Sequence, residues 1–143
     1  MTPHPPPMHC IPLTDVTVWE FYDYLFAPWV KQLGLRNFSV KPGEVSALLP
    51  QSDALKFSSG AVCGQVIMAA LDTVAALAMT TTERVPKSTV YQHTHFLRPA
   101  IDDDFKVTVT VLRFGKTSAF AEGRVTFAGS GELVAQASLE FAF

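Results

Sequence analysis

The sequence predicts a single α+β domain in which a long central helix is wrapped by an antiparallel sheet. Residues 60–82, GAVCGQVIMAALDTVAALAMTTT, are rich in good helix formers and apolar around the whole helical circumference, which is typical of a buried helix. Residues 88–143 then change to a two-residue hydrophobic alternation, which is typical of strands. A chain of 143 residues is long enough for one such core and too short for two ordinary domains.

Residues 1–14, MTPHPPPMHCIPLT, are predicted to be a disordered, proline-rich arm, because the prolines remove helix and ladder hydrogen bonds. The arm lacks a basic leader followed by an apolar run, so no secretory signal is predicted. His4, His9 and Cys10 do not have the spacing of a metal site, and no metal is predicted there. Cys10 and Cys63 define no disulfide framework, so a reducing, cytoplasmic location is expected.

Residues 15–143 are predicted to form the single domain. Its first element is a helix over residues 15–33, which Pro28 ends or kinks near Ala27. Residues 36–40 and 45–49 are two short apolar runs around a Pro-Gly turn, which predicts a hairpin. After the central helix, four strands of an antiparallel meander are expected over residues 88–98, 104–114, 117–127 and 132–143.

The composition argues against several classes of function. The net charge of −2 gives no reason to expect nucleic-acid binding, which needs a clustered positive surface. The longest apolar stretch, residues 61–79, contains Gln65 and Asp72 and is therefore a poor membrane span. His93 and His95 alternate on one strand face, but no third metal ligand is evident, so they are read as lining an interface or cleft.

Asp72 is the residue least like its surroundings. It lies in the middle of the apolar helix, and the side chains one turn away carry no charge: Met68, Ala69, Ala75 and Ala76. Carboxylates are almost never buried without partners, so this position is typical of a functional acid or base. The alternative is a structural Asp that bonds Thr73, a loop amide or a partner subunit.

Gly64 lies at the start of the same helix, where the first N–H groups have no intrahelical partner and suit an oxyanion. Gly64 and Asp72 are eight residues apart, which is roughly 12 Å along a helix. One chain does not easily bring both to a single carbonyl. If both act on one substrate, a symmetric dimer must supply the helix start from one subunit and the Asp from the other.

Four segments, CGQVIMAALDTVAALA, TVYQHTHFLRPA, RFGKTSAFAEGRV and GELVAQASLEFAF, give the sequence a family likeness. From about residue 36 to 143 it resembles the PaaI-type thioesterases, hotdog-fold enzymes related to the 4-hydroxybenzoyl-CoA thioesterases. The resemblance implies a hotdog fold and hydrolysis of an acyl-CoA or aryl-acyl-CoA to free acid and CoA. It also implies a homodimer or a dimer of dimers, and no cofactor other than the CoA of the substrate.

By the same resemblance, Asp72 acts as nucleophile or general base, and the Gly64 N–H of the partner subunit polarises the thioester carbonyl. Thr89 matches a position at which some members place a hydroxyl that positions the attacking water. Nucleotide-phosphate contacts are implied at Arg98 and at the hairpin Lys116-Thr117-Ser118. Two substrate-binding positions depart from the family pattern: Cys63 replaces its His, and Gln65 replaces its second Gly.

Those departures keep a second hypothesis open. It is a non-catalytic hotdog module that binds a CoA or acyl ligand, or only assembles with partners. A third reading, a hotdog dehydratase or hydratase, is less favoured because the paired Asp and His of those enzymes on one loop-helix segment are not evident.

Overall fold

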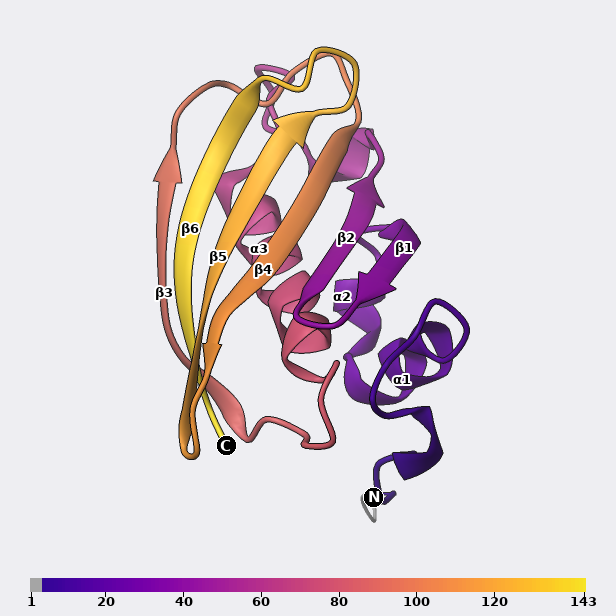
Figure 1. Ribbon diagram of the computed structural model, residues 1–143. Helices are drawn as coiled ribbons and strands as arrows, with labels where there is room; N and C mark the ends of the chain where they lie inside the picture. Colours follow the sequence, from indigo (N-terminus) through magenta and orange to yellow (C-terminus); the bar gives the residue numbers. More distant parts are fainter. Residues whose placement is uncertain (1–3) are drawn as a thin grey trace.

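In the computed structural model, which describes residues 4–143, a six-stranded antiparallel sheet curves around one long helix (Figure 1). The long helix is α3, Gly64–Met79. The strands are β1 Arg36–Lys41, β2 Glu44–Leu49, β3 Ser88–Phe96, β4 Phe105–Phe114, β5 Ser118–Phe127 and β6 Leu133–Ala142, in the spatial order β1-β2-β4-β5-β6-β3. The predicted helix, hairpin and four C-terminal strands are therefore all present, with ends shifted by a few residues.

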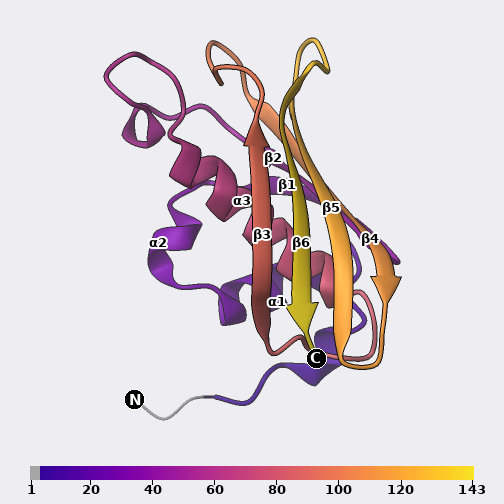
Figure 2. The same ribbon diagram turned by 90° about the vertical axis from the view of Figure 1, so that its left-hand side faces the viewer.

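The predicted meander is correct only for β4, β5 and β6. Instead of pairing with β4, β3 pairs antiparallel with β6, with Phe96 opposite Ala135. The connection from β3 to β4 spans residues 97–104 and contains Pro99, so it is too long for a tight hairpin and crosses the end of the sheet. The crossover places β3 at the edge of the sheet (Figure 2).

The N-terminal region follows its prediction in one place and departs from it in another. The break expected near Ala27 is present: the first helix is divided into α1, Val18–Leu25, and α2, Pro28–Lys31, with Pro28 in the first turn of the second helix. The arm expected to be disordered has a 3-10 turn, η1, over Met8–Cys10, and Cys10 and Leu13 are buried. Burial of these two side chains holds the arm against the rest of the domain, although its proline content suggested disorder.

The core lies between the sheet and the inner face of α3. Leu71 and Val74 of α3 are fully buried against it. Gly123 of β5 lies directly under the helix, and a Cβ atom there would come within 2.7 Å of Leu71 Cδ2. The absence of a side chain at residue 123 therefore allows α3 to pack closely on the sheet.

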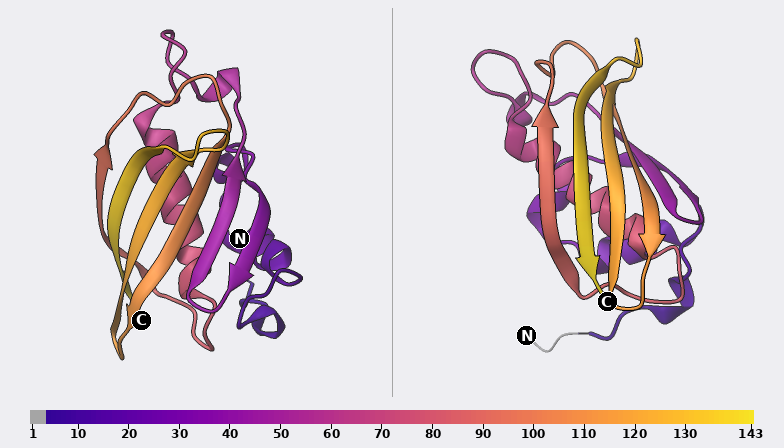
Figure 3. Two further views of the ribbon diagram at one scale, coloured as in Figure 1. Left: turned by 45° about the horizontal axis from the view of Figure 1, so that its top comes forward. Right: turned by 60° about the vertical axis from the view of Figure 1, so that its left-hand side comes forward.

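One flank of α3 is left partly uncovered by the chain's own sheet. The side chains on this flank recur at three- and four-residue spacing and are exposed or half-buried: Gln65, Met68, Ala69, Asp72 and Ala76. The flank faces β3, and no strand within residues 4–143 pairs with the outer edge of β3 (Figure 3). The uncovered helix flank and the unpaired strand edge are therefore neighbours.

Two further features concern the cysteines and the helices. Cys10 is buried and Cys63 half-buried, and both are free thiols. Among the described residues 4–143, no helix is both long enough and apolar enough to cross a membrane.

Candidate active site

Asp72 lies on the uncovered flank of α3 and is hydrogen-bonded to β3. The Thr89 hydroxyl donates to Asp72 Oδ1 at 2.6 Å. The Thr73 hydroxyl donates instead to the Ala69 carbonyl one helical turn back, at 2.7 Å, so the alternative in which Asp72 bonds Thr73 is wrong. Within residues 4–143 the second carboxylate oxygen of Asp72 accepts no hydrogen bond, which leaves it free for a ligand or water.

A β-bulge in β3 directs Thr89 toward the helix. Thr89 is opposite Phe141 of β6, whereas Tyr91 is opposite Glu140, so Val90 is the extra residue. Gln92, further along, faces α3 and donates to the Met68 carbonyl at 3.2 Å. In a regular strand Thr89 and Gln92 would point to opposite faces, and the bulge brings both to the same one.

The start of α3 presents two free backbone donors. Val66 and Ile67 both donate to the Cys63 carbonyl, whereas the N–H groups of Gly64 and Gln65 have no acceptor within residues 4–143. The ring of Phe96 covers Gly64, and its Cζ lies 3.3 Å from the point that a Cβ on residue 64 would occupy. A side chain at residue 64 would therefore push the ring away by a few tenths of an ångström, and glycine allows the closer approach.

A pocket of about 660 Å³ opens at this helix start and is mainly apolar. Of the predicted site residues, Gly64, Gln65 and Arg98 line it, and Asp72 does not. The eight-residue separation of Gly64 and Asp72 on a continuous helix, roughly 12 Å, explains this. One chain therefore supplies a pocket with oxyanion donors and, further along the same helix, a separate carboxylate.

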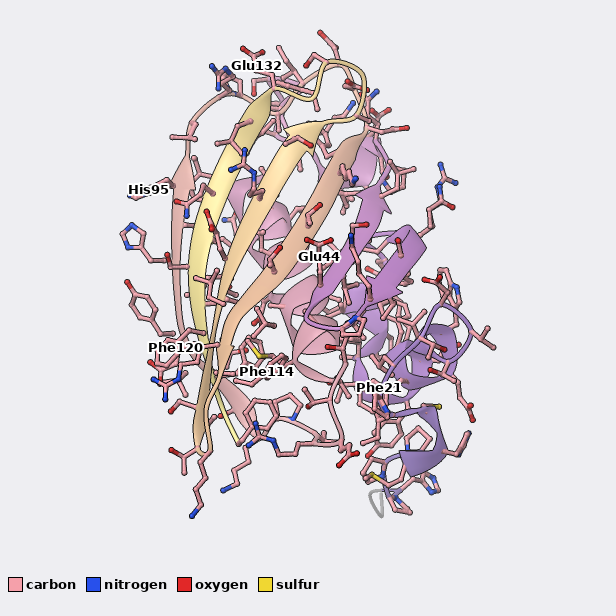
Figure 4. The ribbon with its side chains drawn as sticks, viewed as in Figure 1. Phe21, Glu44, His95, Phe114, Phe120 and Glu132 are labelled. Atoms are coloured by element: carbon pink, nitrogen blue, oxygen red, sulfur yellow. The ribbon has the colours of Figure 1, made fainter. Side chains whose placement is uncertain are left out.

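The predicted phosphate-binding residues lie at opposite ends of the sheet. The Arg98 guanidinium donates to the Leu133 carbonyl at 2.7 Å and pairs with Glu132 at 3.1 Å. The Lys116-Thr117-Ser118 hairpin lies at the far end, where Arg84 donates to the Lys116 carbonyl at 2.8 Å. Figure 4 shows Glu132 and Phe114 marking these two ends. A single chain does not bring the two groups together.

Cys63 precedes α3, and its N–H donates to the Leu55 carbonyl at 3.0 Å. Its half-buried side chain makes no capping hydrogen bond with the helix. Cys63 is therefore next in the chain to the two N–H donors of Gly64 and Gln65, and it is its backbone that borders them.

The sequence did not indicate two of the residues at this site. Phe96 covers Gly64 and lines the pocket, and Gln92 connects β3 to the middle of α3. Both share a strand face with Thr94, so counting alternate residues along β3 groups them together, but only the packing of β3 beside α3 shows that this face meets the helix.

Comparisons with known proteins agree with this architecture. The model of the family "Thioesterase superfamily" matches residues 59–134. No curated protein sequence matches the chain at a significant level.

Solved structures with the same fold include zebrafish thioesterase superfamily member 2, with 24% identity, a TM-score of 0.82, and coverage of 91% of this chain and 98% of that one. A thioesterase family protein from Silicibacter pomeroyi has 23% identity, a TM-score of 0.79, and coverage of 88% and 95%. The Escherichia coli PaaI protein from the phenylacetic acid degradation operon has 17% identity, a TM-score of 0.77, and coverage of 90% and 94%. The predicted hotdog fold is confirmed by these likenesses.

Proposed function

Because this chain belongs to the thioesterase superfamily, we propose that it hydrolyses an acyl-CoA or aryl-acyl-CoA thioester to the free acid and CoA. The observation that carries the proposal is the Asp72–Thr89 pair, a carboxylate held by a hydroxyl on the uncovered flank of α3. Both cysteines are free thiols, which supports a reducing, cytoplasmic location.

Asp72 acts in one of two ways. As a general base it takes a proton from water, whose oxygen attacks the thioester carbonyl carbon while the proton passes to the departing CoA thiolate. As a nucleophile it forms an anhydride with the acyl group, expels the CoA thiolate, and is regenerated by water. In both cases the N–H groups of Gly64 and Gln65 hold the carbonyl oxygen as it gains negative charge, and Thr89 fixes the orientation of Asp72.

The active site is completed by a second copy of the chain. Along the helix, β3 contacts α3 at three places: Thr89 at Asp72, Gln92 at Met68, and Phe96 at Gly64. The Gln92 contact is the middle one of the three. A two-fold axis that passes beside the β3 edge at this midpoint relates the two subunits in opposite directions. The Asp72 end of α3 in one subunit then lies against Gly64 of the partner subunit.

The edge of β3 is suited to this pairing. The Leu97 N–H donates to the Val134 carbonyl, so by the alternation of an antiparallel ladder the N–H groups of Thr94 and Phe96 point away from β6. These outward groups need partners, and an antiparallel β3 from a second copy provides them. The two sheets then form one continuous sheet across the dimer.

The same axis explains the separated phosphate residues. Ser118 and Ser88 are each opposite Ala142, so the Lys116-Thr117-Ser118 hairpin lies two strands from the start of β3. Two strand spacings are about 10 Å. The axis places the start of β3 in one subunit beside the end of β3 in the other, and Arg98 comes directly after that end. Arg98 of one subunit and the hairpin of the other then border one site, with cations and hydroxyls suited to phosphate.

The outer face of the sheet supports a further association into a dimer of dimers. Tyr91, Leu112 and Phe120 are 52%, 65% and 44% exposed there and line an apolar hollow of about 450 Å³. Figure 4 shows Phe120 near the β3 side of the sheet. A second dimer that packs on this face buries the patch. Leu112→Glu is then expected to halve the mass in sedimentation while leaving the thioesterase rate per chain unchanged.

Steady-state assays against a panel of CoA thioesters, from short acyl to aryl-acetyl groups, test the proposed activity. Wild-type protein is expected to turn over at least one ester, and Asp72→Asn to lower its kcat by about 100-fold or more. Background turnover of every ester by both proteins would contradict the proposal. Label in the Asp72 carboxylate after single-turnover hydrolysis in ¹⁸O-labelled water would identify Asp72 as the nucleophile, because a general base acquires none.

One observation favours a second function, binding without catalysis. Gln65 lines the pocket beside the free N–H groups, and its side chain occupies space that the family's glycine leaves open. The protein would then bind a CoA or acyl ligand without hydrolysing it. Calorimetric binding of CoA without turnover of any thioester is the result that supports this alternative, and thioester cleavage dependent on Asp72 is the result that ends it.

A further inference from the structure

The N-terminal arm and α1 bring together three side chains of the types that bind transition metals. His9 Nε2 lies 2.8 Å from Glu20 Oε2, and Cys10 Sγ lies 3.1 Å from the same oxygen. The three ligand atoms all lie within 4.8 Å of one another. Figure 1 shows the arm below α1, near the N-terminus of the chain. Sequence spacing missed this cluster because Glu20 is supplied by a helix that begins after the arm.

The position of Cys10 is fixed independently of the cluster. Its carbonyl accepts a hydrogen bond from the Thr17 hydroxyl at 2.7 Å, and its side chain is only 1% exposed. Leu13, three residues later, donates its N–H to the Thr80 carbonyl at 3.1 Å, which ties the arm to the end of α3. Two of the ligands are therefore carried on a docked segment and the third on a helix, an arrangement that lowers the entropy lost on binding.

The donor set and its spacing suit a zinc-class ion. Imidazole nitrogen, thiolate sulfur and carboxylate oxygen are the usual ligands of Zn²⁺, at about 2.0–2.3 Å, which puts neighbouring ligand atoms about 3.3–3.6 Å apart in a tetrahedral site. The two contacts at Glu20 Oε2, 2.8 and 3.1 Å, need to open by only about 0.5 Å. The side chains of His9 and Glu20 are 68% and 59% exposed, so solvent can supply a fourth ligand.

We propose that His9 Nε2, Cys10 Sγ and Glu20 Oε2 bind one divalent transition-metal ion of the zinc class, with water as the fourth ligand. On binding, the Cys10 thiol releases its proton to solvent, and His9 coordinates through neutral Nε2 with its proton on Nδ1. The ion replaces the two hydrogen bonds that end on Glu20. It fastens the arm to α1, outside residues 59–134 that match the family, and takes no part in thioester hydrolysis.

The test is a Co²⁺ titration of the full-length, tag-free chain after reduction and removal of metals. We expect one Co²⁺ per chain, a thiolate-to-cobalt charge-transfer absorption in the near ultraviolet, and loss of that absorption when Zn²⁺ is added. Cys10→Ser should abolish the absorption. Glu20→Gln and His9→Asn should weaken binding at least about tenfold.

Matched controls identify the site. Cys63→Ser removes the other thiol, and the double variant His93→Asn, His95→Asn removes the other histidine pair, whose Nε2 atoms are 2.9 Å apart; both should retain the absorption. Glu20→Gln keeps an oxygen acceptor for the arm, so it decides the question if Cys10→Ser does not fold. Absence of charge-transfer absorption in wild-type protein, or its loss in Cys63→Ser and retention in Cys10→Ser, would overturn the proposal.

Discussion

Thr89 of β3 and Asp72 of α3 are joined by a 2.6 Å hydrogen bond from the Thr89 hydroxyl to Asp72 Oδ1. The bond depends on the bulge at Val90, which turns Thr89 toward the helix. It fixes one carboxylate oxygen, and no donor within residues 4–143 bonds the other. Asp72 is therefore oriented by its own chain, while the oxyanion donors that it needs lie at the other end of the uncovered flank.

Thr89→Val preserves the shape of the side chain and removes the hydrogen bond to Asp72. We expect kcat to fall by about 10- to 100-fold, the effect of losing a hydrogen bond to a charged group, with little change in KM. Steady-state kinetics on the best CoA ester measure both constants. Thr94→Val, on the same face of β3, is the matched control and should keep its kcat. Equal rates for wild type and Thr89→Val would show that the bond does not orient the catalytic group.

Thr94→Pro tests pairing at the β3 edge. The Thr94 N–H points away from β6, so proline removes a donor to the partner subunit without removing one within the chain. In the Leu112→Glu background, which separates the proposed dimer of dimers into single dimers, we expect Thr94→Pro to give a monomer by sedimentation velocity, with thioesterase activity lost. Thr94→Val keeps the N–H and should remain dimeric. A dimeric, active Thr94→Pro protein would place the interface elsewhere.

Gly123→Ala probes the packing of α3 on the sheet. The added Cβ would lie 2.7 Å from Leu71 Cδ2, so we expect the free energy of unfolding to fall by about 1–3 kcal/mol in urea denaturation. A double-mutant cycle isolates the cause, because Leu71→Ala removes the clashing atom. In the Leu71→Ala background, Gly123→Ala should lower the free energy of unfolding by less than it does in the wild type. An equal loss in both backgrounds would show that the effect does not come from this contact.

The two cysteines should differ in reactivity toward iodoacetamide. Burial, reinforced by the hydrogen bond and negative charge of Glu20, raises the pKa of the Cys10 thiol to about 11. The reactive species is the thiolate, which is therefore scarce at Cys10 near neutral pH, whereas Cys63 is half-buried. Peptide mass spectrometry of the metal-free folded protein at pH 8 should show modification of Cys63 first. Faster labelling of Cys10 would mean that the arm does not stay docked.

The sequence indicated most of the elements of this fold because each has a clear hydrophobic period. The apolar run around Asp72 predicted α3, and the alternation from residue 88 predicted the strands. The position of β3 beside β6 was not predictable in this way, because alternation identifies the faces of a strand and not its neighbours. The docking of the arm depends on two apolar anchors, Cys10 and Leu13, within a segment whose prolines suggest disorder.

The candidate site was predictable to a smaller extent. Asp72 was identified by its charge in an apolar helix, and the eight-residue spacing to Gly64 predicted that one chain would not unite them. The Thr89 bond was out of reach of pattern reasoning because it requires the extra residue at Val90, which changes no hydrophobic period. The roles of Phe96 and Gln92 required knowing that β3 runs beside α3.

The central claim, that each site takes Asp72 from one subunit and the helix start from the other, is tested most directly by complementation. Asp72→Asn removes the carboxylate, and Gly64→Val places a side chain against Phe96 at the helix start, so each chain is expected to be inactive alone. The two chains are unfolded together, refolded and assayed. Half of the randomly formed dimers are mixed, and each mixed dimer has one site with both native residues, so about a quarter of wild-type activity should return. Activity no greater than the sum of the two separate variants would contradict a site shared between subunits.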